Sequence, residues 1–135
     1  MLSRLFLIAA LMFALPAWAD TVVPAGTYRG QVTSGGALSP SEVTFLSGGT
    51  TGCYSITDSS GAYIGRLSDG QAQGANRYSF TWTDKFGTGT VTYAFAEGAA
   101  GFSGKWYVQG RFAGVWNAKR IPEGATAHGC SDPTS

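Results

Sequence analysis

Residues 101–117 read G-F-S-G-K-W-Y-V-Q-G-R-F-A-G-V-W-N and contain one short unit twice. The unit is F-x-G-x-W, at residues 102–106 and again at residues 112–116. Because every second residue of a β-strand points to the same face, each unit places two rings and a gap between them on one face. Glycine weakens a strand interior, but a small closed sheet accepts alternating large and small side chains inside. The segment therefore predicts a small β-barrel.

The rest of the chain, from Gly26 onward, alternates between short β-like segments and turn residues, with no helical period. Connections this short favour antiparallel neighbours in a meander. Residues 34–40 and 69–76 are expected to be loops. Outside the opening segment, the expected strands are 26–33, 42–46, 50–57, 62–68, 77–84 and 88–96. The opening segment adds two more, of which the last is 111–119, and the prediction is an all-β, eight-stranded antiparallel meander barrel.

The aromatic residues support one apolar face. Residues 20–135 hold 15 aromatic residues, which are the 18 of the whole chain minus Phe6, Phe13 and Trp18. Under the alternation above, 13 of these 15 point to one face, and only Phe86 and Tyr107 do not. The other face carries mostly Thr, Ser, Arg, Lys and Gln. A transmembrane barrel needs the opposite arrangement, an apolar exterior around a polar lumen, so we expect a sheet with a dry interior.

Two other sheet architectures compete with the closed barrel. A β-sandwich fits the same strands, but closure into a barrel removes the exposed edges. The second half, with G-x-G-x-V-x-Y near residue 89, also resembles part of the MORN repeat, which implies an open hairpin array. The ring-glycine units begin at Tyr28, Tyr63, Phe102 and Phe112, which are 35, 39 and 10 residues apart, whereas a repeat array has a fixed period. The barrel is therefore the prediction.

The N-terminus has the pattern of a secretory signal peptide. Arg4 precedes an apolar run over residues 5–15, and Ala17-Trp-Ala19 places small residues where a signal peptidase cleaves. The apolar run is shorter than the roughly 20 residues that span a membrane, so no membrane span is expected. Cleavage near Ala19 predicts a periplasmic or secreted protein. The expected organisation is a signal peptide at 1–19, the barrel at 20–119 and a polar tail at 120–135.

The charge and the cysteine content indicate which partners and cross-links to expect. Without Arg4, the 9 basic residues fall to 8, which equals the 8 Asp and Glu residues, and a chain without clustered positive charge is not expected to bind nucleic acid. In an exported protein, two cysteines most simply form one disulfide, here Cys53–Cys130, which would tie the tail to the barrel exterior. The single histidine, His128, has no companion ligands, so no metal site or cofactor is expected.

Catalytic chemistry is not indicated by the sequence. An enzyme needs a nucleophile beside a base, paired carboxylates or a metal, and the carboxylates here fall mostly in turns and at strand ends. Asp84 differs, because it shares the inward parity of Trp82 and would lie at one mouth of the barrel. There it could orient a ligand or cap the turn at 85–87. If the interior holds a ligand, the expected binding residues are Tyr54, Trp82, Asp84, Trp106 and Trp116.

The strand plan resembles the avidin and lipocalin type of barrel. The likeness lies in Gly26-Thr-Tyr28, in Thr51-Gly-Cys-Tyr54 and in Trp82 on the fifth strand. Avidins hold biotin through polar residues, and Ser34 and Tyr54 match that pattern. Gly30 and Ile56 stand where the family has an asparagine and a serine, and the last strand has no aspartate. The resemblance therefore implies a fold and does not predict biotin binding.

Three functions follow as expectations. The first is an exported, non-enzymatic module of structural or protein-interaction type, because so many rings leave little room inside eight short strands. The second is a barrel that binds a small apolar or aromatic ligand, because inward glycines at positions 30, 52, 65, 89, 104 and 114 open local gaps. The third is an inhibitor of an extracytoplasmic enzyme. The partner is therefore expected to be a protein or a small apolar molecule.

Overall fold

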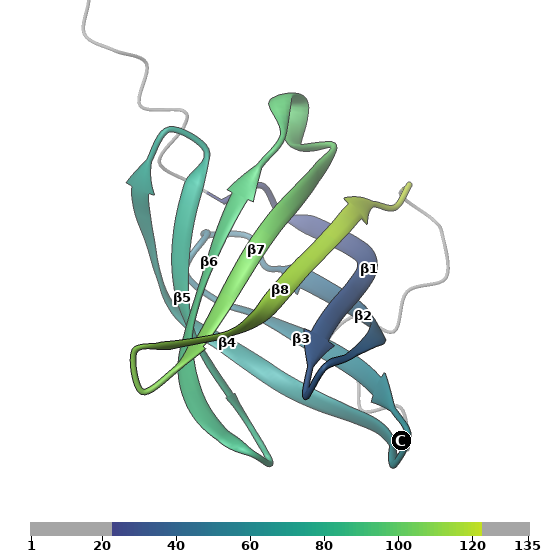
Figure 1. Ribbon diagram of the computed structural model, residues 1–135. Helices are drawn as coiled ribbons and strands as arrows, with labels where there is room; N and C mark the ends of the chain where they lie inside the picture. Colours follow the sequence, from purple (N-terminus) through teal and green to yellow (C-terminus); the bar gives the residue numbers. More distant parts are fainter. Residues whose placement is uncertain (1–22, 123–135) are drawn as a thin grey trace, which may run out of the picture.

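The computed structural model describes residues 23–122, and within this range the chain forms a closed barrel of eight antiparallel strands (Figure 1). Each strand pairs with the next in sequence, and β8 pairs with β1. This confirms the meander barrel and rules out the sandwich and the open array. The elements are β1 (Gly26–Ser34), β2 (Ala37–Phe45), β3 (Gly52–Asp58), β4 (Gly61–Gly74), β5 (Arg77–Asp84), β6 (Gly87–Phe95), the 3-10 turn η2 (Glu97–Ala99), β7 (Gly101–Val108) and β8 (Arg111–Arg120).

The loop predicted at 34–40 was wrong, because β2 begins at Ala37 and forms a tight hairpin with β1. Gly35 and Gly36 have φ angles of 59° and 82°, the left-handed conformation that a two-residue hairpin turn requires at both positions. The sequence alone did not indicate this strand, because a proline such as Pro40 argues against one. Pro40 lies where β2 pairs with β1 before the pairing with β3 begins at Ser41, so its missing N–H breaks no β2–β3 bond.

The loop predicted at 69–76 was also wrong for most of its length, because β4 continues to Gly74. Its pairing with β5 shifts register between Ser68 and Gln71 and again between Ala72 and Gly74. Asp69, with φ of 53°, lies in the first irregularity. Such bulges bend a strand and interrupt its alternation, so the period-2 pattern fades while the strand goes on.

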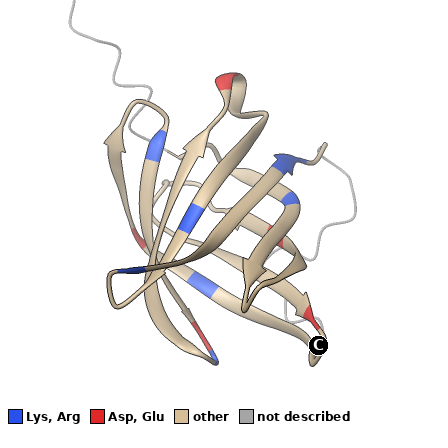
Figure 2. Ribbon diagram, in the orientation of Figure 1, with Lys and Arg blue, Asp and Glu red and all other residues tan. Residues whose placement is uncertain are grey.

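Aromatic side chains fill one half of the barrel. Tyr28 is fully buried and lies 5.5–5.6 Å, centroid to centroid, from the rings of Phe45, Phe95 and Phe102. Val23, which precedes β1, is 1% exposed and belongs to the same buried cluster. This end, on the side of the η2 turn, is therefore closed by packed rings. Figure 2 shows that the charged residues are spread along the strands and turns, η2 among them.

The inward placement predicted for Phe112 was wrong. Between β7 and β8 the register steps from Trp106↔Gly114 to Tyr107↔Phe112, which leaves Ala113 unpaired. A one-residue bulge reverses the faces beyond it. Phe112 is therefore 60% exposed, and its ring lies 6.1 Å from that of Tyr107.

The disulfide prediction involves residues on both sides of the described boundary. Cys53 lies on β3 between the inward Gly52 and Tyr54, and it is buried although its parity points outward. Cys130 lies outside the described residues, as do the predicted signal peptide and residues 123–135 of the tail, so the bridge stays a prediction. The last strand continues to Arg120, one residue past the predicted end of the barrel.

Candidate binding site: an aromatic cup at the open end

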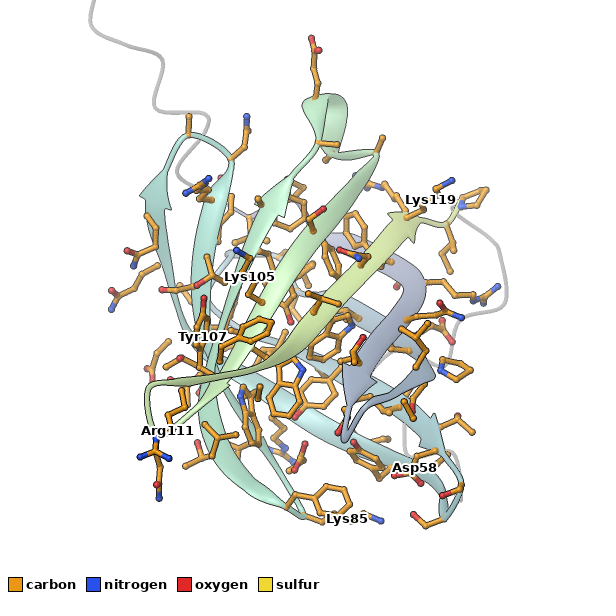
Figure 3. The ribbon with its side chains drawn as sticks, viewed as in Figure 1. Asp58, Lys85, Lys105, Tyr107, Arg111 and Lys119 are labelled. Carbon is orange, nitrogen blue, oxygen red and sulfur yellow. The ribbon has the colours of Figure 1, made fainter. Side chains whose placement is uncertain are left out.

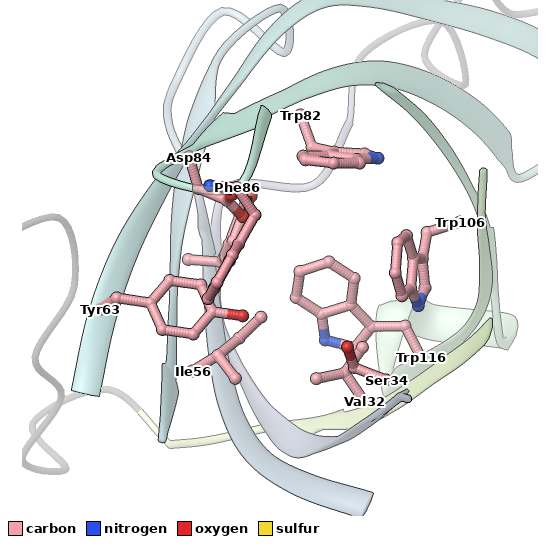
Figure 4. A pocket seen from close by; sticks show the side chains of 10 residues that line it. Val32, Ser34, Ile56, Tyr63, Trp82, Asp84, Phe86, Trp106 and Trp116 are labelled. Atoms are coloured by element: carbon pink, nitrogen blue, oxygen red, sulfur yellow. Dashed lines mark hydrogen bonds between the residues drawn. The ribbon is translucent and has the colours of Figure 1, made fainter. Parts of the chain in front are cut away.

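The two ends of the barrel differ in their turns. At the end opposite η2, the pairings Ser34↔Ala37, Asp58↔Gly61, Asp84↔Gly87 and Val108↔Arg111 close two-residue hairpins. Between these hairpins the barrel is open to a cavity of about 90 Å³, here called the cup (Figure 4). The residues that line the cup are Val32, Ser34, Tyr54, Ile56, Tyr63, Trp82, Asp84, Phe86, Trp106 and Trp116.

The structure brings all the predicted binding residues to this one cavity: Tyr54, Trp82, Asp84, Trp106 and Trp116 all line the cup. Their role toward a ligand stays a prediction. The sequence reading missed Tyr63 and Phe86 as lining residues. Tyr63 was predictable, because it begins a ring-glycine unit with the same inward parity. Phe86 lies in the turn between β5 and β6, two residues after Asp84.

The indole N–H groups of the cup bond to the barrel wall. Trp82 Nε1 donates to the carbonyl of Tyr107 at 3.2 Å, and Trp106 Nε1 donates to that of Thr33 at 2.9 Å. Trp116 Nε1 donates to Ser41 Oγ at 2.9 Å in a buried position. These bonds hold the rings in place and leave their carbon surface for the cavity. Figure 4 shows Trp82 and Trp106 across the opening from Tyr63 and Phe86.

Asp84 is bonded at both carboxylate oxygens. Tyr54 donates its hydroxyl to Oδ2 at 2.7 Å, and the backbone N–H of Phe86 donates to Oδ1 at 2.8 Å. The second bond is the turn cap that the sequence left as one of two possibilities, and the same side chain also lines the cup. Burial, and then the hydrogen bond and negative charge of Asp84, raise the pKa of Tyr54 well above its ordinary value. Tyr54 therefore remains a protonated donor to Asp84 at neutral pH.

Two inward glycines make room for rings of the cup. The Tyr54 ring crosses β4 directly over Gly65, where a Cβ atom would overlap the ring. The Trp82 ring lies over Gly89, where a Cβ atom would be 2.7 Å from ring carbons. Real Cβ atoms do not approach other atoms so closely, so these gaps in the sequence pattern are filled by neighbouring rings. The result is a largely filled barrel with a shallow cavity at one end.

Exposed apolar side chains lie on or beside the hairpins at the open end. Among the described residues, the large apolar side chains that are exposed at the open end are those of Leu38, Phe86, Val108 and Phe112, here called the rim. They are 63%, 64%, 38% and 60% exposed, and they lie on or beside the β1–β2, β5–β6 and β7–β8 hairpins. Of the rim residues, only Phe86 also lines the cup, and Leu38 lines a hollow on the outer wall together with Val115. Leu46 follows β2 at the other end.

Charged groups flank the cup on the hairpins. Lys85 Nζ lies 5.0 Å from the ring centroids of both Tyr63 and Phe86. Burial, followed by the charges of Asp84 and Asp58, raises the pKa of Tyr63 to about 12. Figure 3 shows Asp58 and Lys85 at the open end, with Arg111 at the tip of the β7–β8 hairpin.

Other hollows among the described residues are wider and more open to solvent than the cup. Within residues 23–122, no group of three or more His, Cys, Asp and Glu side chains is placed to hold a metal ion. In the same range, no helix is long and apolar enough to cross a membrane. A scan with protein-family models and a search of curated protein sequences found no match to this chain.

Proposed function

We propose that this chain is an exported, non-enzymatic binding protein and that the open end of the barrel is its contact surface. In this proposal the cup takes up one compact group of a protein partner, and the rim contacts the surface around that group. The observation that carries the proposal is the convergence of Tyr54, Trp82, Asp84, Trp106 and Trp116 on a single cavity at this end. Export rests on the signal-peptide pattern of residues 1–19.

The size of the cup favours a group that belongs to a larger partner. Pockets for free ligands begin near roughly 300 Å³, whereas the cup measures about 90 Å³. Protein interfaces obtain most of their binding energy from a few anchors in aromatic pockets, surrounded by contacts that exclude water. The cup offers an aromatic pocket of this kind, and the rim adds exposed apolar surface at the same end. An inhibitor of an extracytoplasmic enzyme would be one use of such a surface.

The second candidate is a free small molecule in the cup, in line with the resemblance to avidin and lipocalin barrels. The meander order of the strands and the open end of the barrel support this second proposal. Ser34 and Tyr54, the positions that match the biotin pattern, both line the cup. Ile56 makes the same wall apolar where a serine is expected, so biotin is not the ligand we propose. A free ligand would have to be a small fragment.

Nuclear magnetic resonance tests the proposal directly. The described tryptophans, Trp82, Trp106 and Trp116, all line the cup, so their indole N–H signals report on it. A library of compact fragments of every charge type, added to the ¹⁵N-labelled protein, should shift these signals and those of the surrounding hairpins. Phe112→Ser on the rim should weaken a larger peptide hit, and Leu46→Ser at the opposite end is the control. Shifts confined to the outer wall, or none at all, would overturn the proposal.

A further inference from the structure

We infer that the group taken up by the cup is an organic cation, such as an alkylated ammonium head. This inference rests on the proposed function, because it assumes that the cup is the binding site. It names the chemical class that the lining of the cup can recognise.

The hydrogen-bonding groups of the lining favour a cation over an anion. The indole N–H groups of Trp82, Trp106 and Trp116 are engaged by the wall, and the Tyr54 hydroxyl is engaged by Asp84. In the part of the cup formed by described residues, the other polar groups are the hydroxyls of Ser34 and Tyr63 and the Asp84 carboxylate, each of whose oxygens can accept a further hydrogen bond. An ionised carboxylate accepts hydrogen bonds and donates none. An anion in the cup would therefore face a negative charge without an indole donor to offset it.

The aromatic rings of the lining provide a second attraction for a cation. The faces of aromatic rings carry negative charge density, and tryptophan attracts cations most strongly. Trp82 and Trp106 stand at 83° to each other with centroids 5.8 Å apart, so together they form two sides of a corner. Tyr63 and Phe86 lie on the opposite side of the opening (Figure 4). Quaternary ammonium groups are recognised by such groups of aromatic side chains.

The protein already places one cation against these rings. The Lys85 ammonium lies 5.0 Å from the centroids of Tyr63 and Phe86, at the outer edge of the cup. Lys85 is exposed; Asp84 shares its β5–β6 hairpin, and Asp58 lies on the β3–β4 hairpin. A ligand cation therefore meets the Asp84 carboxylate in the lining and one competing ammonium at the edge of the cup. The cavity of about 90 Å³ suits a compact head group.

A pair of isosteres tests the charge requirement. Choline and tetramethylammonium are titrated into the protein, beside 3,3-dimethylbutan-1-ol, the uncharged carbon analogue of choline. Tryptophan fluorescence and the indole N–H signals follow binding. Both cations should bind saturably, and the neutral analogue should bind at least about tenfold more weakly. Equal binding of the analogue, or binding of neutral or anionic fragments alone, would overturn the cation assignment and leave the proposed function standing. If no fragment of any charge shifts the signals, both fail.

Two variants locate the charge effect. Asp84→Asn keeps an oxygen for the Phe86 N–H and removes the charge, so choline affinity should fall about tenfold and the affinity of a neutral fragment should fall less. Lys85→Gln removes the internal competitor, and choline affinity should rise severalfold. Lys105→Gln, an exposed lysine on the outer face of β7, is the matched control and should change nothing (Figure 3). An unchanged affinity in Lys85→Gln, together with an unchanged affinity in a folded Asp84→Asn variant, would overturn the assignment.

A third ligand shows whether the cation belongs to a protein partner or to a free small molecule. N-acetyl-trimethyllysine methylamide carries the same head group as choline on a peptide backbone that can also touch the rim. Tighter binding of this compound than of choline assigns the cation to a protein partner. Equal or weaker binding assigns it to a free small molecule and overturns the protein-partner part of the proposed function.

Discussion

The hydroxyl of Tyr54 on β3 reaches the carboxylate of Asp84 at the end of β5, with an oxygen–oxygen distance of 2.7 Å. These strands are not neighbours, because β4 lies between them. The Tyr54 ring crosses β4 at Gly65, where there is no side chain to obstruct it. The absence of a side chain at Gly65 therefore allows Tyr54, inside the barrel, to bond to Asp84 beside the β5–β6 turn, which consists of Lys85 and Phe86.

Gly65→Ala should break this connection. The added Cβ atom would overlap the Tyr54 ring, and such overpacking costs about 1–3 kcal/mol in the free energy of unfolding. Urea denaturation measures the loss, and a shift in the Phe86 amide signal would show that the turn has moved. Arg66→Ala, at the neighbouring exposed position, is the control and should change stability by less than about 0.5 kcal/mol. A fully stable Gly65→Ala variant would contradict the packing.

Phe102 and Phe112 begin identical F-x-G-x-W units but lie in different environments. Phe102 is 4% exposed, so Phe102→Ala should cost about 3–5 kcal/mol, as is typical of a buried phenylalanine. Phe112 is 60% exposed, so Phe112→Ala should cost less than about 1 kcal/mol. Chemical denaturation of both variants compares them directly. Similar losses in the free energy of unfolding would show that Phe112 is buried and would contradict the bulge.

This pair also illustrates what the sequence could and could not predict. The alternation of rings and glycines was enough for the barrel, its strand order and the inward face, because burial on one face imposes a period of two residues. Bulges break that period without a clear composition signal. For this reason the extension of β4 to Gly74 and the outward direction of Phe112 were not predicted.

The cup was predictable in its deeper residues and less so at its edge. Trp82, Trp106 and Trp116 share the inward parity, and Asp84 follows Trp82 by two residues, so strand geometry alone places them together. Phe86 lies in a turn, where side-chain direction depends on the Asp84 cap rather than on alternation. The rings of Tyr54 and Trp82 fill the gaps at glycines on the neighbouring strands. Which glycine faces which ring depends on the register between strands, and one sequence does not reveal that register.

The Cys53–Cys130 disulfide can be tested by mass spectrometry. The mature protein, analysed without reduction, should be lighter by two hydrogens than the reduced protein. The cysteines are 77 positions apart, and in the chain-entropy model a loop of that length stabilises the folded state by about 4 kcal/mol, with strain reducing the gain. Cys130→Ser should therefore lower the midpoint of urea unfolding. Two alkylatable thiols in oxidised protein would refute the bridge.

Tyr93→Phe should leave the protein as stable as before or make it more stable. The Tyr93 hydroxyl is buried and has no hydrogen-bond partner among the described residues. A buried, unsatisfied polar group costs about 1–3 kcal/mol, so its removal should raise the free energy of unfolding by about 1 kcal/mol. Tyr54→Phe is the contrast, because it removes a donor that Asp84 uses, and it should lower stability by about 1 kcal/mol. A loss in Tyr93→Phe would indicate a partner for that hydroxyl.

Alkaline pH should destabilise the barrel through its buried tyrosines. Burial raises the pKa of Tyr93 well above its ordinary value, and burial with the hydrogen bond and charge of Asp84 does the same for Tyr54. Unfolded tyrosines ionise near pH 10, so above that pH the unfolded chain has released protons that the folded chain still holds. Stability is therefore fully present below about pH 10 and falls as the pH rises further. The contribution of Tyr63 is lost between about pH 10 and its folded pKa of about 12. Urea unfolding at pH 8, 9, 10 and 11 measures the slope, which Tyr54→Phe should make shallower and Phe112→Leu should leave unchanged. A slope that is the same in Tyr54→Phe and the parent protein would show that Tyr54 ionises as readily in the folded chain as in the unfolded one, against its burial beneath Asp84.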